Sequence, residues 1–300
     1  MTEVLVKTLK MTSVLALVLS VTAPAFGSGT TGPGRKVADP KGKYAKLAGQ
    51  ITQLDNHLPG KRAWSGNAFV IGSEGCFLMT NFHVAFDTGE NDPVSGMGIV
   101  RGDYDVGHKV NFSFDLNART GKFDRQVKAT VVEFGNHGDK NGDIAILRLD
   151  ECLGKDYGHL ELVSYTNRTP KGRIMTVSSA MTADQKGNVI NVEEGCRAQA
   201  NPAGPDMLAL FCDAERGMSG SMVLEEQANG DWKLVGLMSA IGKDVAFAIG
   251  PRNVSRFATA VAGMTSGTEA VAEGVKDRRP QAEQTASVSN TVSRPRTVVR

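Results

Sequence analysis

The chain has 300 residues, and its 34 Lys and Arg against 32 Asp and Glu leave a net charge of +2. This balance argues against a protein whose main partner is nucleic acid or an anionic membrane, because both need a clear basic excess. Hydrophobic residues make up 41% of the chain, which is enough for a buried core and excludes a wholly disordered protein. The 34 glycines, about 11% of the chain against a usual ~7%, favour a fold rich in strands and turns.

The N-terminus has the three parts of a secretory signal peptide. Lys7 and Lys10 precede an apolar stretch over 11–21, and the small residues Ala-Pro-Ala follow over 23–25. The apolar stretch is shorter than the ~20 residues that a membrane-spanning helix needs, and no later segment is long enough. We therefore predict a signal peptide over 1–25 and an exported protein, periplasmic or secreted, with no stable membrane span after cleavage. A short N-terminal anchor helix is the alternative.

Polar segments flank the part of the chain that is expected to fold. Residues 26–46 are rich in Gly, Thr, Pro and Lys and have no apolar period, so we predict a flexible arm. Residues 263–300 are polar and contain no large aromatic residue, which predicts a disordered tail. The basic residues near the C-terminus are typical of a solvated tail.

Between these ends the pattern is that of strands. Short apolar and β-branched segments alternate with glycine-containing turns, among them the hairpin signal Asn229-Gly230. A short closing helix is expected at 254–261. Many short strands without a βαβ alternation predict an all-β barrel or sandwich. The expected strands are 64–71, 76–80, 128–134, 143–149, 173–178, 189–192, 207–212, 221–225, 232–238 and 245–249.

The turn over 217–221, Gly-Met-Ser-Gly-Ser, carries the clearest chemical signal. A nucleophilic serine needs a tight turn that presents its hydroxyl, with backbone N–H groups aimed at the oxyanion that forms. Glycines allow that backbone shape and let a substrate carbonyl approach closely. The same pattern also occurs in ordinary turns, so Ser219 is a candidate only together with suitable partners.

Two further segments supply such partners. Residues 80–84 read Thr-Asn-Phe-His-Val and place His83 just past the end of an apolar strand. Residues 141–147 read Asn-Gly-Asp-Ile-Ala-Ile-Leu and place Asp143 at the head of an apolar strand, where a half-buried carboxylate can orient a histidine ring. The chain order His, Asp, Ser is that of chymotrypsin-type triads and differs from the order in subtilisins and α/β-hydrolases.

With these three segments the chain resembles a bacterial trypsin-like serine endopeptidase of the chymotrypsin fold, over about residues 64–260. They correspond to the family patterns Thr-x-x-His, Asp-Ile-Ala-Leu-Leu and Gly-Asp-Ser-Gly-Gly-Pro. The resemblance implies an all-β fold of two six-stranded antiparallel barrels with a short C-terminal helix. The first barrel would span 47–160 and carry the His and the Asp, and the second would span 161–262 and carry the Ser.

The resemblance also implies a catalytic role for each residue. His83 would act as general base, Asp143 would hold its ring, and the N–H groups of Gly217 and Ser219 would receive the oxyanion. The implied partners are protein or peptide substrates, without a cofactor. Met218 stands where animal members carry the aspartate that pairs with a newly cut N-terminus, so activation by that ion pair is not expected.

Specificity residues follow from the same resemblance. Asp213 lies six residues before Ser219, where trypsin-like members have the acidic base of the primary pocket, and would bind a substrate Arg or Lys. The opposite wall would contain Ser239 and Ile241. The alternative is that Asp213 makes a local turn bond or pairs with Arg216.

The four cysteines suit disulfides in an exported protein. Cys196 with Cys212 is the first choice of pairing and Cys76 with Cys152 the second, although four cysteines allow three connectivities. No metal site is predicted. The sequence over 139–143 begins like a calcium loop, but Ile144 stands where that loop needs glycine.

Two rival functions use the same residues. A catalytically inactive protein of this fold could bind peptides, although all three triad residue types are present. An esterase would normally have a Gly-x-Ser-x-Gly turn within a βα sheet, whereas strands dominate here. We therefore predict an exported serine endopeptidase, and the sequence does not indicate its oligomeric state.

Overall fold

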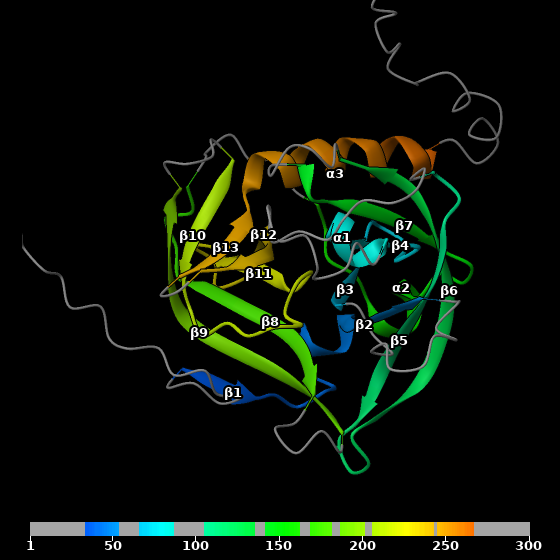
Figure 1. Cartoon of the computed structure of the whole chain (residues 1–300), viewed down its shortest axis with the longest axis horizontal. Coiled ribbons are helices and arrows are strands. Elements are labelled where there is room, and N and C mark those ends of the chain that lie inside the picture. The colour runs from blue at the N-terminus through cyan, green and yellow to red at the C-terminus, as the bar shows by residue number, and fades with distance from the viewer. Residues whose placement is uncertain are drawn as a thin grey trace, which may run out of the picture.

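A computed structural model describes the chain over residues 34–53, 66–86, 105–135, 142–162, 169–181, 187–201, 206–242 and 245–266. Within these residues the strands form two closed six-stranded antiparallel barrels that lie side by side (Figure 1). The predicted fold class is therefore confirmed. The predicted signal peptide and nearly all of the predicted tail lie outside the described residues.

The first barrel closes in the order β2-β3-β4-β7-β6-β5. Its strands are β2 (Ala48–Gln53), β3 (Gly66–Ile71), β4 (Phe77–Thr80), β5 (Lys109–Asn117), β6 (Lys122–Phe134) and β7 (Ala145–Leu149). The strand β5, which the sequence analysis did not predict, has strict polar and apolar alternation, and its buried residues Val110, Phe112 and Phe114 face the core. The strands β3 and β4 are buried along their whole length, as their largely apolar sequences predict, and their polar residues are Asn67 and Thr80.

The second barrel follows the order β9-β10-β13-β12-β11-β8 and closes through pairing of β9 with β8. Its strands are β8 (Ile174–Met181), β9 (Asn188–Ala200), β10 (Met207–Phe211), β11 (Met222–Glu226), β12 (Trp232–Ile241) and β13 (Ala246–Ile249). The hairpin between β11 and β12 turns at Asn229-Gly230, where Gly230 has φ of +81°.

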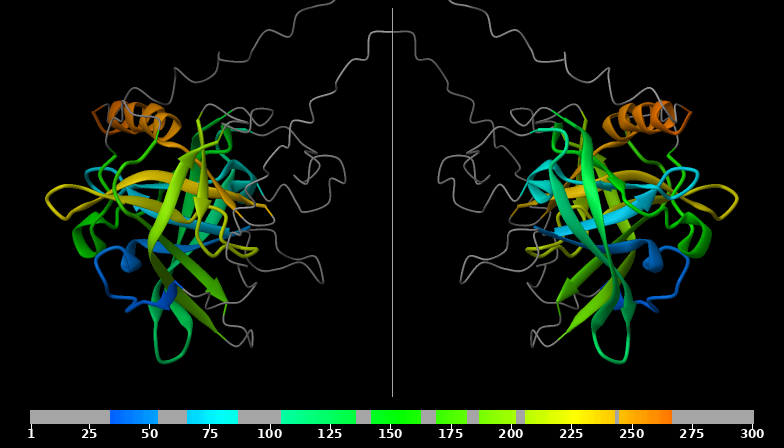
Figure 2. Two further views of the ribbon diagram at one scale, coloured as in Figure 1. Left: turned by 90° about the vertical axis from the view of Figure 1, so that its left-hand side faces the viewer. Right: turned by 90° about the vertical axis from the view of Figure 1, so that its right-hand side faces the viewer.

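The helical segments are short except the last one. They are η1 (Ala45–Leu47), α1 (Phe82–Ala85), α2 (Gly154–Tyr157) and α3 (Pro251–Ser266). The helix α3 lies along one end of the molecule in both side views (Figure 2), and Val254, Phe257 and Val261 on one face are buried in the main core. No helix in the described ranges combines the length and the apolar composition that crossing a membrane requires.

Part of the predicted flexible arm is structured instead. The strand β1 (Arg35–Val37) adds to the edge of the second barrel by antiparallel pairing with β9, in a register that places Arg35 opposite Glu193. The pairing continues with a hydrogen bond from the Ala38 N–H to the Ile190 carbonyl oxygen, 2.8 Å long. Backbone hydrogen bonds order this edge strand, and such bonds require no apolar period in the sequence. The composition of 26–46 therefore did not reveal β1.

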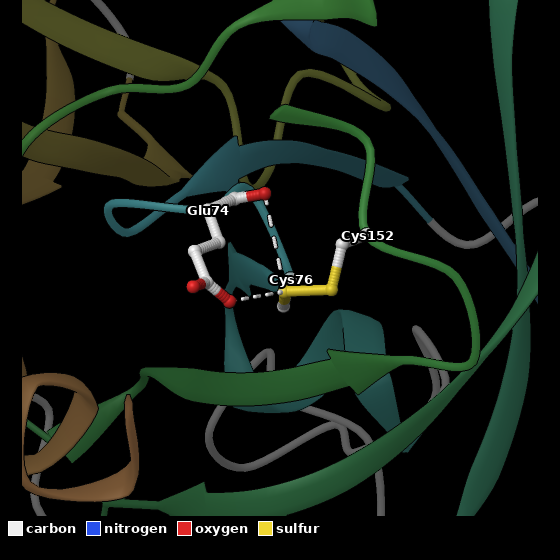
Figure 3. Close-up of side chains that lie close together, drawn as sticks. All are labelled: Glu74, Cys76 and Cys152. Atoms are coloured by element: carbon white, nitrogen blue, oxygen red, sulfur yellow. Dashed lines mark hydrogen bonds between the residues drawn. A yellow bond between two sulfur atoms is a disulfide. The ribbon is translucent and has the colours of Figure 1, made fainter. Parts of the chain in front are cut away.

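Two disulfides join the described cysteines, Cys196 with Cys212 and Cys76 with Cys152. The first links β9 to the residue after β10 and so anchors the loop that begins at Asp213. The second links the start of β4 to the segment after β7, with the Glu74 carboxylate 3.7 Å from the sulfur of Cys76 (Figure 3). Because a disulfide sulfur has no proton to donate, this is a packing contact.

Candidate active site

Pairing of β4 with β7 brings His83 and Asp143 together. The register places Thr80 opposite Ala145, so a residue just past the end of β4 lies beside one just before β7. His83 Nδ1 lies 2.9 Å from Asp143 Oδ2, and the His83 backbone N–H donates to Oδ1 over 3.1 Å. The buried Asn81 side chain holds the backbone of Asp143 in place, because its Nδ2 donates to the Asp143 carbonyl oxygen over 2.9 Å.

The carboxylate sets both the tautomer and the charge of the imidazole. A carboxylate only accepts, so Nδ1 carries the proton and Nε2 of the neutral ring keeps its lone pair. Burial disfavours the charged imidazolium, but the charge of Asp143 and its hydrogen bond favour it more strongly. The net effect raises the pKa of His83 above its usual 6.5.

Ser219 lies on a turn that only glycines allow. Gly217 and Gly220 have φ of +94° and +81°, in the left-handed region. A Cβ atom on Gly220 would lie 2.0 Å from the Asn67 carbonyl oxygen, so the turn can contact β3 only because this residue has no side chain.

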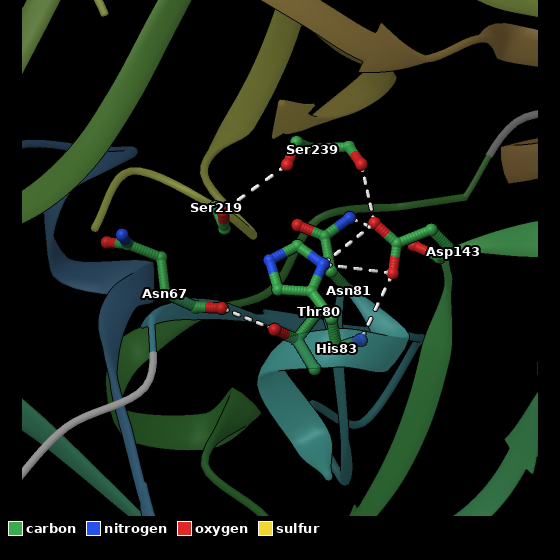
Figure 4. Close-up of polar contacts among 7 residues, drawn as sticks. All are labelled: Asn67, Thr80, Asn81, His83, Asp143, Ser219 and Ser239. Atoms are coloured by element: carbon green, nitrogen blue, oxygen red, sulfur yellow. Dashed lines mark hydrogen bonds and ion pairs between the residues drawn. The ribbon is translucent and has the colours of Figure 1, made fainter. Parts of the chain in front are cut away.

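Ser239, in β12, connects the three candidate residues. Its hydroxyl donates to Asp143 Oδ2, and its carbonyl oxygen accepts a hydrogen bond of 3.4 Å from Ser219 Oγ. Figure 4 shows the imidazole of His83 between the Asp143 carboxylate and Ser219. The residues therefore form one cluster with contributions from both barrels, although Ser219 Oγ bonds to Ser239 rather than to the ring.

Two backbone donors beside Ser219 are not used within the described structure. The N–H groups of Met218, Gly220 and Ser221 donate to backbone carbonyls, whereas those of Gly217 and Ser219 bond to no group in the described ranges. Two neighbouring N–H groups can bind an oxyanion that forms next to the serine hydroxyl.

Asp213 lies in a second buried polar cluster. It is 2% exposed, and neither carboxylate oxygen has a hydrogen-bond partner among the described residues. Its backbone N–H donates to Glu193 Oε2 over 2.9 Å. The side chain of Arg35, itself 1% exposed, brings a positive charge 3.0 Å from Glu215 Oε1. The cluster thus combines three carboxyl groups with one guanidinium.

Burial and the neighbouring Asp213 charge raise the pKa of Glu193 from 4.5 to about 7. The hydrogen bond from the Asp213 N–H and the charge of Arg35 oppose this rise only in part. Glu193 is therefore neutral in mildly acidic solution and becomes charged near neutral pH.

The other predicted residues occupy different surroundings. Ile241, predicted on a pocket wall, is 45% exposed at the end of β12. Met218 is buried with the second-barrel core, and its sulfur accepts the Glu215 N–H over 3.3 Å. Two groups in the described part combine a glutamate with two cysteines at metal-binding distances, but each cysteine pair is a disulfide and lacks the thiolate that a metal needs.

Several residues near the site were not found from the sequence. Asn67 interrupts the buried apolar run of β3, and Asn81 directly follows a buried strand, so each could have been noticed as a polar residue in an apolar setting. The sequence around Arg35 and Glu193 gives no comparable indication, because these two residues meet only through the pairing of β1 with β9.

Substitution of Asp143 should change the titration of His83. In Asp143→Asn the opposing burial remains while the charge is lost, so the pKa of His83 should fall below that of the wild type. NMR titration of the histidine Cε1 proton measures this directly. An unchanged His83 pKa in the folded variant would show that the carboxylate does not control the ring.

Glu193 should make stability depend on pH. The unfolded chain releases this proton near pH 4.5 and the native protein near pH 7, so the free energy of unfolding should decrease as pH rises between these values. Urea unfolding of the wild type and Glu193→Gln from pH 4.5 to 8 isolates the contribution, because the variant keeps every other titrating group. Parallel pH curves for the two proteins would contradict it.

Comparison with known proteins agrees with this architecture. A family model described as a trypsin-like peptidase domain matches residues 66–237. A Glu endopeptidase of known structure has 17% sequence identity and a TM-score of 0.51, over 79% of this chain and 98% of its own. The structure of GrC has 12% identity and a TM-score of 0.52, over 78% of this chain and 99% of its own. No curated protein matches the chain by sequence.

At these identities the two structures establish similarity of fold alone. The family model, in contrast, matches more than half of the chain and includes the segments that carry His83, Asp143 and Ser219. The chain therefore belongs to the trypsin-like family of serine peptidases and has the chymotrypsin fold.

Proposed function

We propose that this protein is an exported serine endopeptidase that cleaves peptide bonds after Arg or Lys, with Ser219, His83 and Asp143 as its catalytic triad. The observation that carries the proposal is the cluster in which Asp143 holds the His83 ring next to Ser219. Within this cluster Asp143 bonds to His83 across 60 residues of sequence and to Ser239 across 96.

The arrangement supports acyl transfer in two steps. Neutral His83 accepts the Ser219 proton at Nε2 as the serine oxygen attacks the peptide carbonyl, and the Asp143 charge stabilises the imidazolium. The N–H groups of Gly217 and Ser219 then donate to the oxyanion. His83 protonates the leaving amine, and a water molecule hydrolyses the acyl-enzyme by the same route.

The Asp213 cluster supports specificity for a basic side chain. With Glu193 neutral, the charges of Asp213, Glu215 and Arg35 sum to −1, and ionisation of Glu193 makes the sum more negative. A buried carboxylate without a partner is strongly favoured to bind a cation. This cluster would disfavour an acidic substrate, which the name of the similar Glu endopeptidase would otherwise suggest.

The proposed export rests on two independent features. The N-terminal sequence has the composition of a signal peptide, and the described cysteines all form disulfides. Disulfides persist in the periplasm or outside the cell and are compatible with either location.

Ser219→Ala should abolish covalent labelling by a fluorophosphonate probe and turnover of casein, because the attacking oxygen is removed. Ser221→Ala is the matched control, since Ser221 is buried two residues further on and its hydroxyl has no hydrogen-bond partner in the described structure. Its labelling should equal that of the wild type. Labelling that survives Ser219→Ala, or a wild type that binds peptides without reacting, would contradict the proposal.

Asp213→Asn should lower kcat/KM for substrates with Arg or Lys at the cut site by about 10- to 100-fold, which corresponds to the loss of one charge-assisted hydrogen bond. Asp231→Asn serves as the control, because Asp231 lies exposed in the hairpin between β11 and β12 and belongs to neither polar cluster. Cleavage profiling on a peptide library measures both variants. A wild-type preference for Glu at the cut site would refute this specificity.

A further inference from the structure

Asn67 is the one polar side chain in the buried strand β3, and it is 1% exposed. All of its polar groups are bonded. Its backbone N–H donates to the Ser219 carbonyl over 2.7 Å, and its carbonyl accepts from the Thr80 hydroxyl. Its side chain makes two more bonds, to the Gly217 carbonyl and to the Ser179 N–H. A residue bonded in this way has a fixed position.

The chemistry of the partners fixes the orientation of the Asn67 amide. The Gly217 carbonyl can only accept, so Nδ2 faces it, at 2.7 Å. The Ser179 N–H can only donate, so Oδ1 faces it, at 2.6 Å. One side chain of the first barrel thus binds both the Ser219 turn and the strand β8 of the second barrel.

The bond from the Asn67 side chain to Gly217 acts on a glycine in the left-handed region. A glycine at φ of +94° has wide backbone freedom, and the Gly217 N–H is one of the two donors beside Ser219. Holding the Gly217 carbonyl restricts rotation of the peptide that follows, while the bond from the Asn67 N–H does the same for the carbonyl of Ser219. The two residues whose N–H groups have no partner within the described ranges, Gly217 and Ser219, are therefore both held by Asn67.

We propose that Asn67 is a positioning residue, whose side-chain amide orients Gly217 so that the N–H groups of Gly217 and Ser219 converge on the oxyanion. This inference rests on the proposed peptidase function. Preorganised donors lower the barrier because they need not reorient as charge develops. Loss of the amide should therefore impair the transition state while substrate binding is retained.

Gln50 provides a matched control for a purely structural role. It lies opposite Asn67 in the pairing of β2 with β3, is 4% exposed, and crosses to the same second-barrel segment. Its Nε2 donates to Ser179 Oγ over 3.1 Å and to Asn188 Oδ1 over 3.0 Å. In the part of the chain that the structure describes, Gln50 makes no hydrogen bond to the Ser219 turn, so its loss removes only hydrogen bonds between the two barrels.

The experiment compares Asn67→Ala with Gln50→Ala on a peptide substrate that the wild type cleaves. For Asn67→Ala we expect kcat to fall about 10- to 100-fold, below the ~10²–10³-fold loss typical when an oxyanion donor is removed outright. KM should stay within about threefold, and affinity for a peptide aldehyde, which forms a tetrahedral adduct, should fall in parallel with kcat. Gln50→Ala should change kcat by less than about threefold, and urea unfolding checks that both variants are folded.

Asn67→Asp adds a second measurement, the pH dependence of kcat, which would not change if Asn67 had a purely structural role. The new carboxyl still accepts the Ser179 N–H, but it can donate to Gly217 only when protonated. The ratio of variant to wild-type kcat should therefore fall as pH rises. If kcat and the affinity for the aldehyde are no lower in Asn67→Ala than in Gln50→Ala, the inference about Asn67 is overturned while the proposed peptidase function stands. A wild type that neither cleaves peptides nor reacts with fluorophosphonate would instead refute the proposed function.

Discussion

Close approach of the two barrels at Gly66 and Gly220 is the constraint on which the rest of the site depends. A Cβ atom on Gly66 would lie 2.8 Å from the Ser219 carbonyl oxygen, and one on Gly220 would lie 2.0 Å from that of Asn67. Because both side chains are absent, backbone groups of β3 and of the Ser219 turn can bond directly. The turn is therefore held against the barrel that carries His83 and Asp143, and its geometry does not depend on the second barrel alone.

The buried residues Asp143 and Asp213 differ in how their charge is balanced. Asp143 accepts hydrogen bonds from His83 and Ser239, and its charge and its hydrogen bond to the ring raise the pKa of the histidine. Asp213 has no such donors in the described structure, and the pKa of its neighbour Glu193 rises to about 7. The first environment suits a residue that stabilises positive charge on a fixed partner. The second suits one whose cationic partner is supplied by a ligand, as the proposed specificity requires.

Much of the fold could be predicted from the sequence, because continuous apolar strands and glycine turns are local signals. The candidate residues His83 and Asp143 were found for the same reason, since each stands next to such a strand. The interactions that hold them together could not be predicted this way. Asn67 reaches Gly217 across 150 residues of sequence, and Arg35 reaches Glu215 only because β1 pairs with β9. Such contacts depend on tertiary register, which leaves no local periodicity.

The pairing of β1 with β9 makes the charge balance of the Asp213 cluster depend on an N-terminal strand. Trimming that stops before Gly34 would leave both barrels and the Arg35 guanidinium intact. A cut beyond Val37 would remove the only cation described in the Asp213 cluster and leave its carboxyl groups to repel one another. A short edge strand far from Ser219 in sequence thereby supplies the positive charge that partly offsets this buried acidic cluster.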